Sequence, residues 1–310
     1  MHLRAGSLLC FFLLLASQAF SQQDTALALV STGREEAAIQ LPATTLAAPD
    51  ADDHAGRAGH NPDRPYFLNY PVDLPIMIAG TAWTLYAFKP IYSKENSSEA
   101  QILALDKNDL SGFDRWATRY YSEAADASSN YLFYGSIPVP FLLFLDKNIR
   151  RDAVKISALY LEAMAITGTL YTAGDMLVDR YRPLAYNPDA PMKERVSGIA
   201  KNSFFAGHVA LVGTATFYTA AVYDRYHSDS WTKWLVYGAA AGATLGTAYL
   251  RLKAGRHFPS DIVVGTLVGV GSGLLVPYLH RNKNWQLKRL GFSPLLRSDG
   301  VKGISLAWRL

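Results

Sequence analysis

Six apolar segments separated by short polar stretches set the strongest limit on how this chain can fold. They run Val72–Phe88, Tyr131–Leu145, Ile156–Gly174, Phe204–Val222, Trp231–Leu250 and Ile262–Leu279. Several are only about 17 to 19 residues long, close to the roughly 20 that cross a bilayer as a helix. Small residues recur in the last three, which favours close helix contact in a membrane. The pattern predicts an all-α, six-helix membrane-type bundle, with a soluble helical domain as the alternative.

The composition favours a membrane over nucleic acid. Hydrophobic residues make up 50% of the 310 positions and charged residues only 18%. The net charge of +4 is modest, and the basic residues stand in short clusters beside the apolar segments. Such clusters are typical of residues that flank membrane spans, whereas a nucleic-acid site needs a basic stripe or face. We therefore expect membrane lipids, and no nucleic acid, as partners.

The two ends of the chain differ from its middle. Residues 1–21 have a basic start, an apolar core and small residues at Ala19 and Ser21, which predicts a cleaved signal peptide. The single cysteine, Cys10, lies within it, so thiol chemistry is not expected in the mature chain. Residues 22–65 are predicted to be a flexible linker. Residues 66–282 would form the helical domain, and 283–310 a tail with a β-hairpin turning at Asp299-Gly300.

The basic clusters predict the orientation in the membrane. They flank the second and third segments (Arg150, Arg151, Lys155) and follow the sixth (Arg281, Lys283, Lys288, Arg289). The positive-inside rule places both clusters in the cytoplasm, so the opposite helix ends face the periplasm. A cleaved signal would leave the linker outside, so either the signal is misread or Val72–Phe88 does not span. We expect an inner-membrane protein, with a periplasmic or outer-membrane-associated location as the alternative.

The outward helix ends carry charged residues that are costly near a membrane and are typically functional. In RLKAGRHFPSD, Pro259 favours a helix start. His257 and Asp261 are four residues apart, a spacing that places two side chains on one helical face. Asp261 could accept a hydrogen bond from one imidazole nitrogen and leave the other free as a nucleophile or base. For this pair alone, a surface histidine paired with a carboxylate is the simpler interpretation.

Three further residues extend this pair into an anion site. His208 follows Gly207 at the expected start of a helix, where free N–H groups and the helix dipole favour an anion. Arg182 and Arg251 add donors that match phosphate oxygens. Two histidines beside an anion site are what phosphoryl transfer needs for a nucleophile and a general acid.

These residues resemble the type 2 phosphatidic acid phosphatase superfamily, which includes bacterial membrane lipid phosphatases and vanadium haloperoxidases. Its signature is K-x6-R-P, then P-S-G-H, then S-R-x5-H-x3-D. The matches are Arg182-Pro183, Phe205-Ala206-Gly207-His208, and Leu250-Arg251 with His257 and Asp261. The resemblance covers about Ile156 to Leu279.

The resemblance implies a mechanism and a bundle with its active site at the outward helix ends. His257 would attack phosphorus and form a phosphohistidine, oriented by Asp261. His208 would protonate the leaving oxygen and then activate water. Arg182, Arg251 and the N–H groups of Gly207 and His208 would hold the phosphoryl oxygens. Neither a metal nor a cofactor is expected at this site.

Four positions depart from the signature. Asp175 replaces the lysine, Ala206 and Leu250 replace serines, and Phe205 replaces proline. Asp175 lies on the same helical face as Arg182 and could pair with it. Candidates for the missing cation are Arg180, Lys201, Lys253 and Arg256.

The expected function is a phosphatase that removes the terminal phosphate from a lipid phosphate or diphosphate, of the phosphatidate or polyprenyl diphosphate class. Asp175 and Ala206 leave open a catalytically weakened phosphate- or lipid-binding relative. The signal-like start leaves open a soluble periplasmic acid phosphatase or haloperoxidase.

Overall fold

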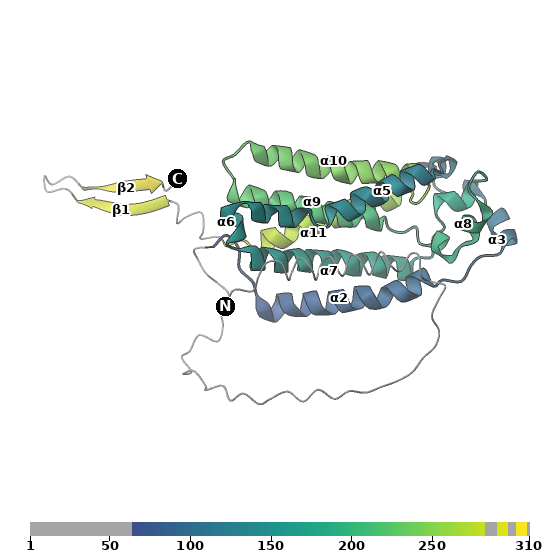
Figure 1. Ribbon diagram of the computed structural model, residues 1–310, viewed down its shortest axis with the longest axis horizontal. Coiled ribbons are helices and arrows are strands. Elements are labelled where there is room, and N and C mark those ends of the chain that lie inside the picture. The colour runs from purple at the N-terminus through teal and green to yellow at the C-terminus, as the bar shows by residue number, and fades with distance from the viewer. Residues whose placement is uncertain (1–63, 283–289, 297–301, 309–310) are drawn as a thin grey trace, which may run out of the picture. The chain divides into compact units, whose positions relative to one another are not determined.

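Long helices that run side by side form the main body of the protein (Figure 1). The computed structural model describes residues 64–282 and two strands, 290–296 and 302–308. The long helices are α2 (Tyr70–Tyr92), α5 (Glu123–Ser136), α7 (Ala153–Leu177), α9 (Gly207–Tyr226), α10 (Thr232–Lys253) and α11 (Pro259–Leu279). In the figure, the short helices α3 (Glu99–Leu103) and α8 (Met192–Val196) lie at one end of the long ones. The helix α6 (Lys147–Arg150) lies at the other end.

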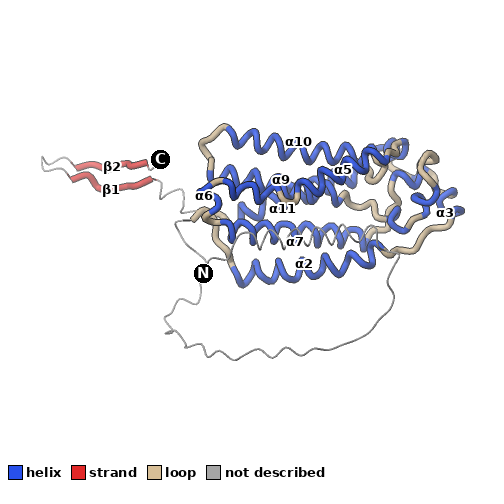
Figure 2. The backbone as a smooth tube through the Cα atoms, in the orientation of Figure 1, coloured by secondary structure: helices blue, strands red, loops and turns tan. Residues whose placement is uncertain are grey.

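The connections between the long helices contain further short helical turns, as the tube in Figure 2 makes clear. They are α4 (Gly112–Arg115) and the 3-10 helices η1 (Lys107–Asp109), η2 (Trp116–Arg119), η3 (Val139–Leu145), η4 (Pro183–Tyr186) and η5 (Gly198–Lys201). The segments η4 and η5 lie between α7 and α9 along the chain, and they carry the residues that lead into the predicted site.

All six apolar segments of the sequence are helical. Five coincide largely with one long helix each, whereas Tyr131–Leu145 is divided between α5 and η3. Pro138 and Pro140 explain the division, because proline lacks the N–H that a continuous α-helix needs. Among the described residues, α7 and α11 are long and apolar enough to cross a membrane. A bundle with six membrane spans therefore stays a prediction.

Helix α9 lies at the centre of the bundle. It packs against α11, α10, α7 and α5, while α2 packs against α7. Two buried tyrosines hold this core through their hydroxyl groups: Tyr218 donates to the carbonyl oxygen of Ile156 at 2.6 Å, and Tyr160 to that of Ile137 at 2.8 Å. Because a buried hydroxyl is costly without a partner, these bonds fix how the helices face one another.

A stripe of glycines brings α11 against α9. A Cβ atom added at Gly265 would lie 2.6 Å from the carbonyl oxygen of Ala206, and one at Gly273 would lie 2.7 Å from that of Thr214. Gly269, midway between them, meets Ala210 more closely still. The missing side chains let the two backbones approach, as in tightly packed membrane helices. The contact aligns the starts of α9 and α11, where the predicted histidines lie.

The strands β1 (Leu290–Leu296) and β2 (Lys302–Trp308) pair antiparallel, with Leu290 opposite Trp308 and Leu296 opposite Lys302. The expected turn at Asp299-Gly300 lies outside the described residues, and so do the expected signal peptide and the linker up to residue 63. The position of the turn, the signal peptide and the linker therefore stay predictions.

Candidate active site

The predicted site residues lie where α9 and α11 begin, where α10 ends, and in the segment that follows α7. The helix starts are joined directly, because the amide N–H of Ala206 donates to the carbonyl oxygen of Asp261 at 3.2 Å. His257 interacts electrostatically with Arg251, Arg182 and His208. The tertiary structure thus brings together residues that the sequence separates by up to 75 positions, from Arg182 to His257.

His257 is held in one tautomer. Its side chain is buried, and its Nδ1 lies 2.7 Å from the carbonyl oxygen of Ser203. Because a carbonyl oxygen can only accept, Nδ1 carries a proton and Nε2 of the neutral ring keeps its lone pair. Burial, together with the positive charges of Arg251 and Arg182, holds the pKa of His257 well below its usual range. A neutral imidazole with a free nitrogen is what a nucleophile requires.

The prediction that Asp261 contacts the imidazole of His257 is wrong, because another group holds that ring. The Oδ2 of Asp261 accepts from the Ser203 hydroxyl at 2.7 Å and from the amide of Phe258 at 2.9 Å. Asp261 stands in the first turn of α11, so its carboxylate reaches back to the free N–H groups of the helix start. Asp261 therefore supports His257 through Ser203.

Arg180 is engaged by carboxylates and is not available to phosphate. Its guanidinium bonds Asp261 and, 2.8 Å away, the Oδ2 of Asp114. It also lies 4.4 Å from the ring centre of Phe258. Asp114 in turn accepts from the hydroxyl of Ser260 at 2.7 Å. This network fastens the start of α11 to α4.

Arg182 is buried and has free donors. Its Nε donates to the carbonyl oxygen of Asn202 at 3.0 Å, while its terminal nitrogens have no hydrogen-bond partner in the described part of the chain. The expected pairing of Asp175 with Arg182 does not form: the carboxylate of Asp175 is buried beside the Tyr171 hydroxyl, and its interaction with Arg182 is electrostatic only. Arg182 is thus left with two groups that can donate to an anion.

Arg251 and Arg256 share one carboxylate. Arg251 donates to Oδ1 of Asp126 at 2.6 Å, and Arg256 donates to Oδ2 of the same residue at 2.8 Å. Arg251 also reaches the hydroxyl of Ser129 at 3.3 Å. Both acceptors lie on α5, so this helix positions an arginine of the predicted anion site.

His208 lies at the start of α9. Its Nε2 is 3.0 Å from Oδ1 of Asn130, and its ring lies 4.4 Å from that of Phe133. The amide groups of Gly207 and His208 have no partner among the described residues, as expected for a helix start. A Cβ at Gly207 would lie 2.6 Å from the Tyr171 ring, so glycine is required there.

Sequence reasoning missed the contribution of α5. Asp126, Ser129 and Asn130 are spaced three and four residues apart, which places them on one helical face. That polar face directly before an apolar segment was the available signal. Ser203 and Asp114 had no such signal, because each acts through a contact that is distant in sequence.

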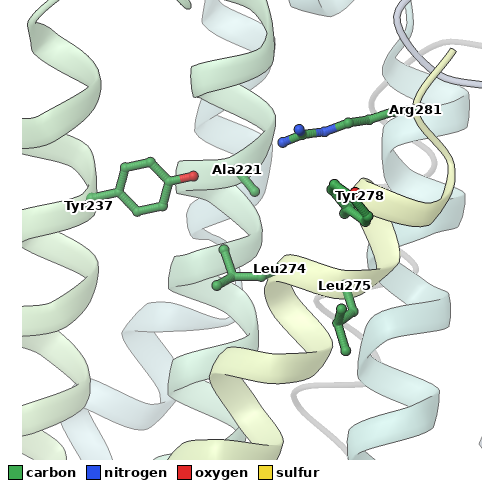
Figure 3. A pocket seen from close by; sticks show the side chains of 6 residues that line it. All are labelled: Ala221, Tyr237, Leu274, Leu275, Tyr278 and Arg281. Carbon is green, nitrogen blue, oxygen red and sulfur yellow. The ribbon is translucent and has the colours of Figure 1, made fainter. Parts of the chain in front are cut away.

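A cavity of about 280 Å³ lies between α9, α10 and α11 (Figure 3). It is lined by Ala221, Tyr237, Leu274, Leu275, Tyr278 and Arg281. Ala221 is about 20 Å along α9 from His208, at 1.5 Å per residue. The cavity is therefore not part of the candidate active site.

The comparisons with known proteins agree with the motif. The family model described as the PAP2 superfamily matches residues 157–285. That range holds every residue of the three-part signature, so the resemblance to the type 2 phosphatidic acid phosphatases is confirmed. No curated protein and no solved structure matches the chain.

Proposed function

We propose that the protein is a phosphatase acting on phosphate esters, because residues 157–285 match the family model of the PAP2 superfamily. The substrate is the terminal phosphate of a lipid phosphate or diphosphate, of the phosphatidate or polyprenyl diphosphate class. The observation that carries the proposal is the buried His257, whose Nδ1 is bound to Ser203 and whose Nε2 is free beside two arginines.

The reaction has two steps. In the first, Nε2 of His257 attacks phosphorus, the bond to the leaving oxygen breaks, and that oxygen takes a proton from His208. In the second, His208 takes a proton from water as the water oxygen attacks phosphohistidine, which releases phosphate and restores His257. Arg182, Arg251 and the amides of Gly207 and His208 stabilise the charge on the phosphoryl oxygens. Asp261 is a positioning residue.

Of the four candidate cations, Arg256 is the one whose charge would replace the lysine of the family signature, although it also pairs with Glu194 at 3.2 Å in the absence of substrate. Its electrostatic interactions reach both Arg182 and Arg251, and it shares Asp126 with Arg251. The other candidates are engaged elsewhere: Lys201 donates to the carbonyl oxygen of Glu95 at 2.9 Å, and Lys253 lies 4.1 Å from the ring centre of Tyr120.

The outer surface of the helices supports a membrane location. Large apolar side chains are exposed on α2, α10 and α11, among them Ile78, Leu245 and Leu267 at 62%, 63% and 68%. Continuous exposed apolar surface marks a membrane or protein contact. A site at the ends of such helices is open to a lipid that approaches sideways. We propose an inner-membrane protein with its site toward the periplasm.

Phosphate release from a substrate panel tests the proposal. Purified protein would be given phosphatidate, a polyprenyl diphosphate and a soluble phosphate monoester. We expect lipid hydrolysis that His257→Ala abolishes and that the matched variant His227→Ala retains, because His227 pairs with Asp146, outside the site. Unchanged release by His257→Ala would disprove the mechanism. Equal rates on the soluble ester, with recovery of the protein in a detergent-free fraction, would favour a soluble acid phosphatase.

A second candidate function is phosphate binding without efficient catalysis. The carboxylate of Asp175 is buried beside the Tyr171 hydroxyl, and it interacts electrostatically with Arg182. Its negative charge opposes a bound phosphate. Vanadate binding without turnover, together with turnover gained in the double variant Asp175→Lys and Ala206→Ser, would favour this candidate.

A further inference from the structure

Three ionisable side chains that the phosphatase reaction does not use meet near the other end of the helices. Asp73 lies in the first turn of α2, Glu162 within α7, and His280 directly after α11. They are buried, with exposed fractions of 2%, 4% and 8%. Ionised groups are rarely buried unless a partner or a metal compensates them.

The spacing of their ligand atoms suits a metal ion. The Nε2 of His280 lies 3.1 Å from Oδ1 of Asp73 and 3.7 Å from Oε2 of Glu162, and the three atoms all lie within 4.8 Å of one another. In a tetrahedral zinc site with bonds of about 2.0–2.1 Å, neighbouring ligand atoms are roughly 3.3 Å apart. The two measured distances lie on either side of that value.

The surrounding contacts orient these ligands. The Nδ1 of His280 lies 2.8 Å from the carbonyl oxygen of Val276, so Nδ1 donates to that carbonyl and Nε2 is the ring nitrogen that faces Asp73 and Glu162. The second oxygen of Asp73 accepts from the amide of Asn69 at 2.6 Å. Histidines that bind metals typically donate their other N–H to a carbonyl or carboxylate in this way.

Glu162 is the observation that points to a missing cation. Its Oε2 is buried and has no hydrogen-bond partner in the described part of the chain, and neither carboxylate pairs with a lysine or arginine there. A divalent cation placed between the two carboxylates would give the buried Oε2 of Glu162 a partner.

We propose that Asp73, Glu162 and His280 bind a divalent transition-metal ion of the Zn²⁺ class. One nitrogen and two carboxylate oxygens form a borderline donor set, for which Zn²⁺ is favoured over Mg²⁺. Three protein ligands leave one tetrahedral position for water. The ion would tie the start of α2 to α7 and to the end of α11, at a site separate from the phosphate site.

Metal analysis of the full-length protein, purified without a polyhistidine tag, tests the proposal. We expect about one Zn²⁺ per chain by mass spectrometry after incubation with Zn²⁺ and desalting. Co²⁺ substitution is expected to give visible absorption of the tetrahedral type, and Zn²⁺ but not Mg²⁺ is expected to raise the melting temperature.

Matched variants separate this site from adventitious binding. Glu162→Gln, which preserves the side-chain shape, and His280→Gln are each expected to weaken Zn²⁺ binding at least tenfold. His227→Gln is expected to retain it. Absence of bound Zn²⁺ in the wild-type protein, or binding unaffected by both ligand variants, would overturn the proposal. If the variants do not fold, the wild-type stoichiometry and Co²⁺ spectrum decide.

Discussion

The imidazole of His257 is oriented by the backbone of Ser203, whose carbonyl oxygen lies 2.7 Å from Nδ1. The hydroxyl of the same serine donates to Oδ2 of Asp261, also at 2.7 Å. One residue therefore links the proposed nucleophile to the aspartate of the family motif. The segment that leads into α9 therefore orients the imidazole of His257, and the first turn of α11 supports that segment through Asp261.

Removing the Ser203 hydroxyl tests this link. Ser203→Ala keeps the carbonyl that holds His257 but removes the bond to Asp261. The loss of about 1 kcal/mol from one hydrogen bond predicts a roughly five- to tenfold lower kcat with an unchanged KM. Steady-state kinetics would measure both constants. Ser136→Ala is the control, because that hydroxyl bonds only its own helix, at Phe133. A change in KM alone would contradict a positioning role.

Arg256 is expected to bind phosphate, and its replacement should affect substrate and inhibitor binding. Arg256→Ala removes a cation next to Arg182 and Arg251, so we expect phosphate or vanadate affinity to fall about tenfold or more. Lys253→Ala is the control, because Lys253 lies over the ring of Tyr120. Inhibition constants for vanadate would compare the two. Equal effects would show that the site responds only to overall charge.

Asp126 is the counterion that holds two arginines in the absence of substrate. Asp126→Asn leaves Arg251 buried without its carboxylate, which is expected to lower the free energy of unfolding by about 3 kcal/mol. Phosphate would then be the main counterion left to Arg251, so it should raise the melting temperature of the variant more than that of the wild type. Thermal unfolding with and without phosphate measures this difference, and equal shifts would refute the explanation.

His257 is expected to remain neutral below its ordinary pKa of about 6.5. Its folded-state pKa is depressed by burial and by Arg251 and Arg182. The contribution of the neutral form to folding is therefore fully present above about pH 6.5. It falls as the pH drops below about 6.5, where the unfolded chain takes up a proton, and is lost once the pH has passed through the lower folded value. Imidazole resonances assigned with His257→Gln would report the titration. A midpoint at or above pH 6.5 in the free enzyme would contradict the environment described here.

The close contact of α11 with α9 predicts opposite effects at two glycines of one helix. Gly269→Ala drives a methyl group into the backbone at Ala210 and is expected to cost about 1–3 kcal/mol of stability and to separate the two helix starts. Gly271→Ala meets nothing within 4 Å and is expected to be neutral or slightly stabilising. Thermal unfolding and kcat would be measured for both. Similar losses would show that the glycine stripe does not position the site.

Local patterns determined where the helices lie and which residues carry the chemistry. Runs of apolar residues predict the long helices, and Gly207 and Pro259 mark two of their starts. The spacing of Arg182, His208, Arg251 and His257 indicated the resemblance to the PAP2 superfamily, because a motif depends on residue order, which is visible in the chain.

Only the tertiary structure decided how those residues are held. Asp261 bonds Ser203 instead of His257, and Asp126 reaches Arg251 from a helix that precedes it by 125 residues. Asp73 and His280 are 207 residues apart and still lie 3.1 Å from each other. The physical reason is that helical periodicity fixes which face a side chain occupies, whereas its partner depends on how separate helices pack, and that packing leaves no local pattern in the sequence.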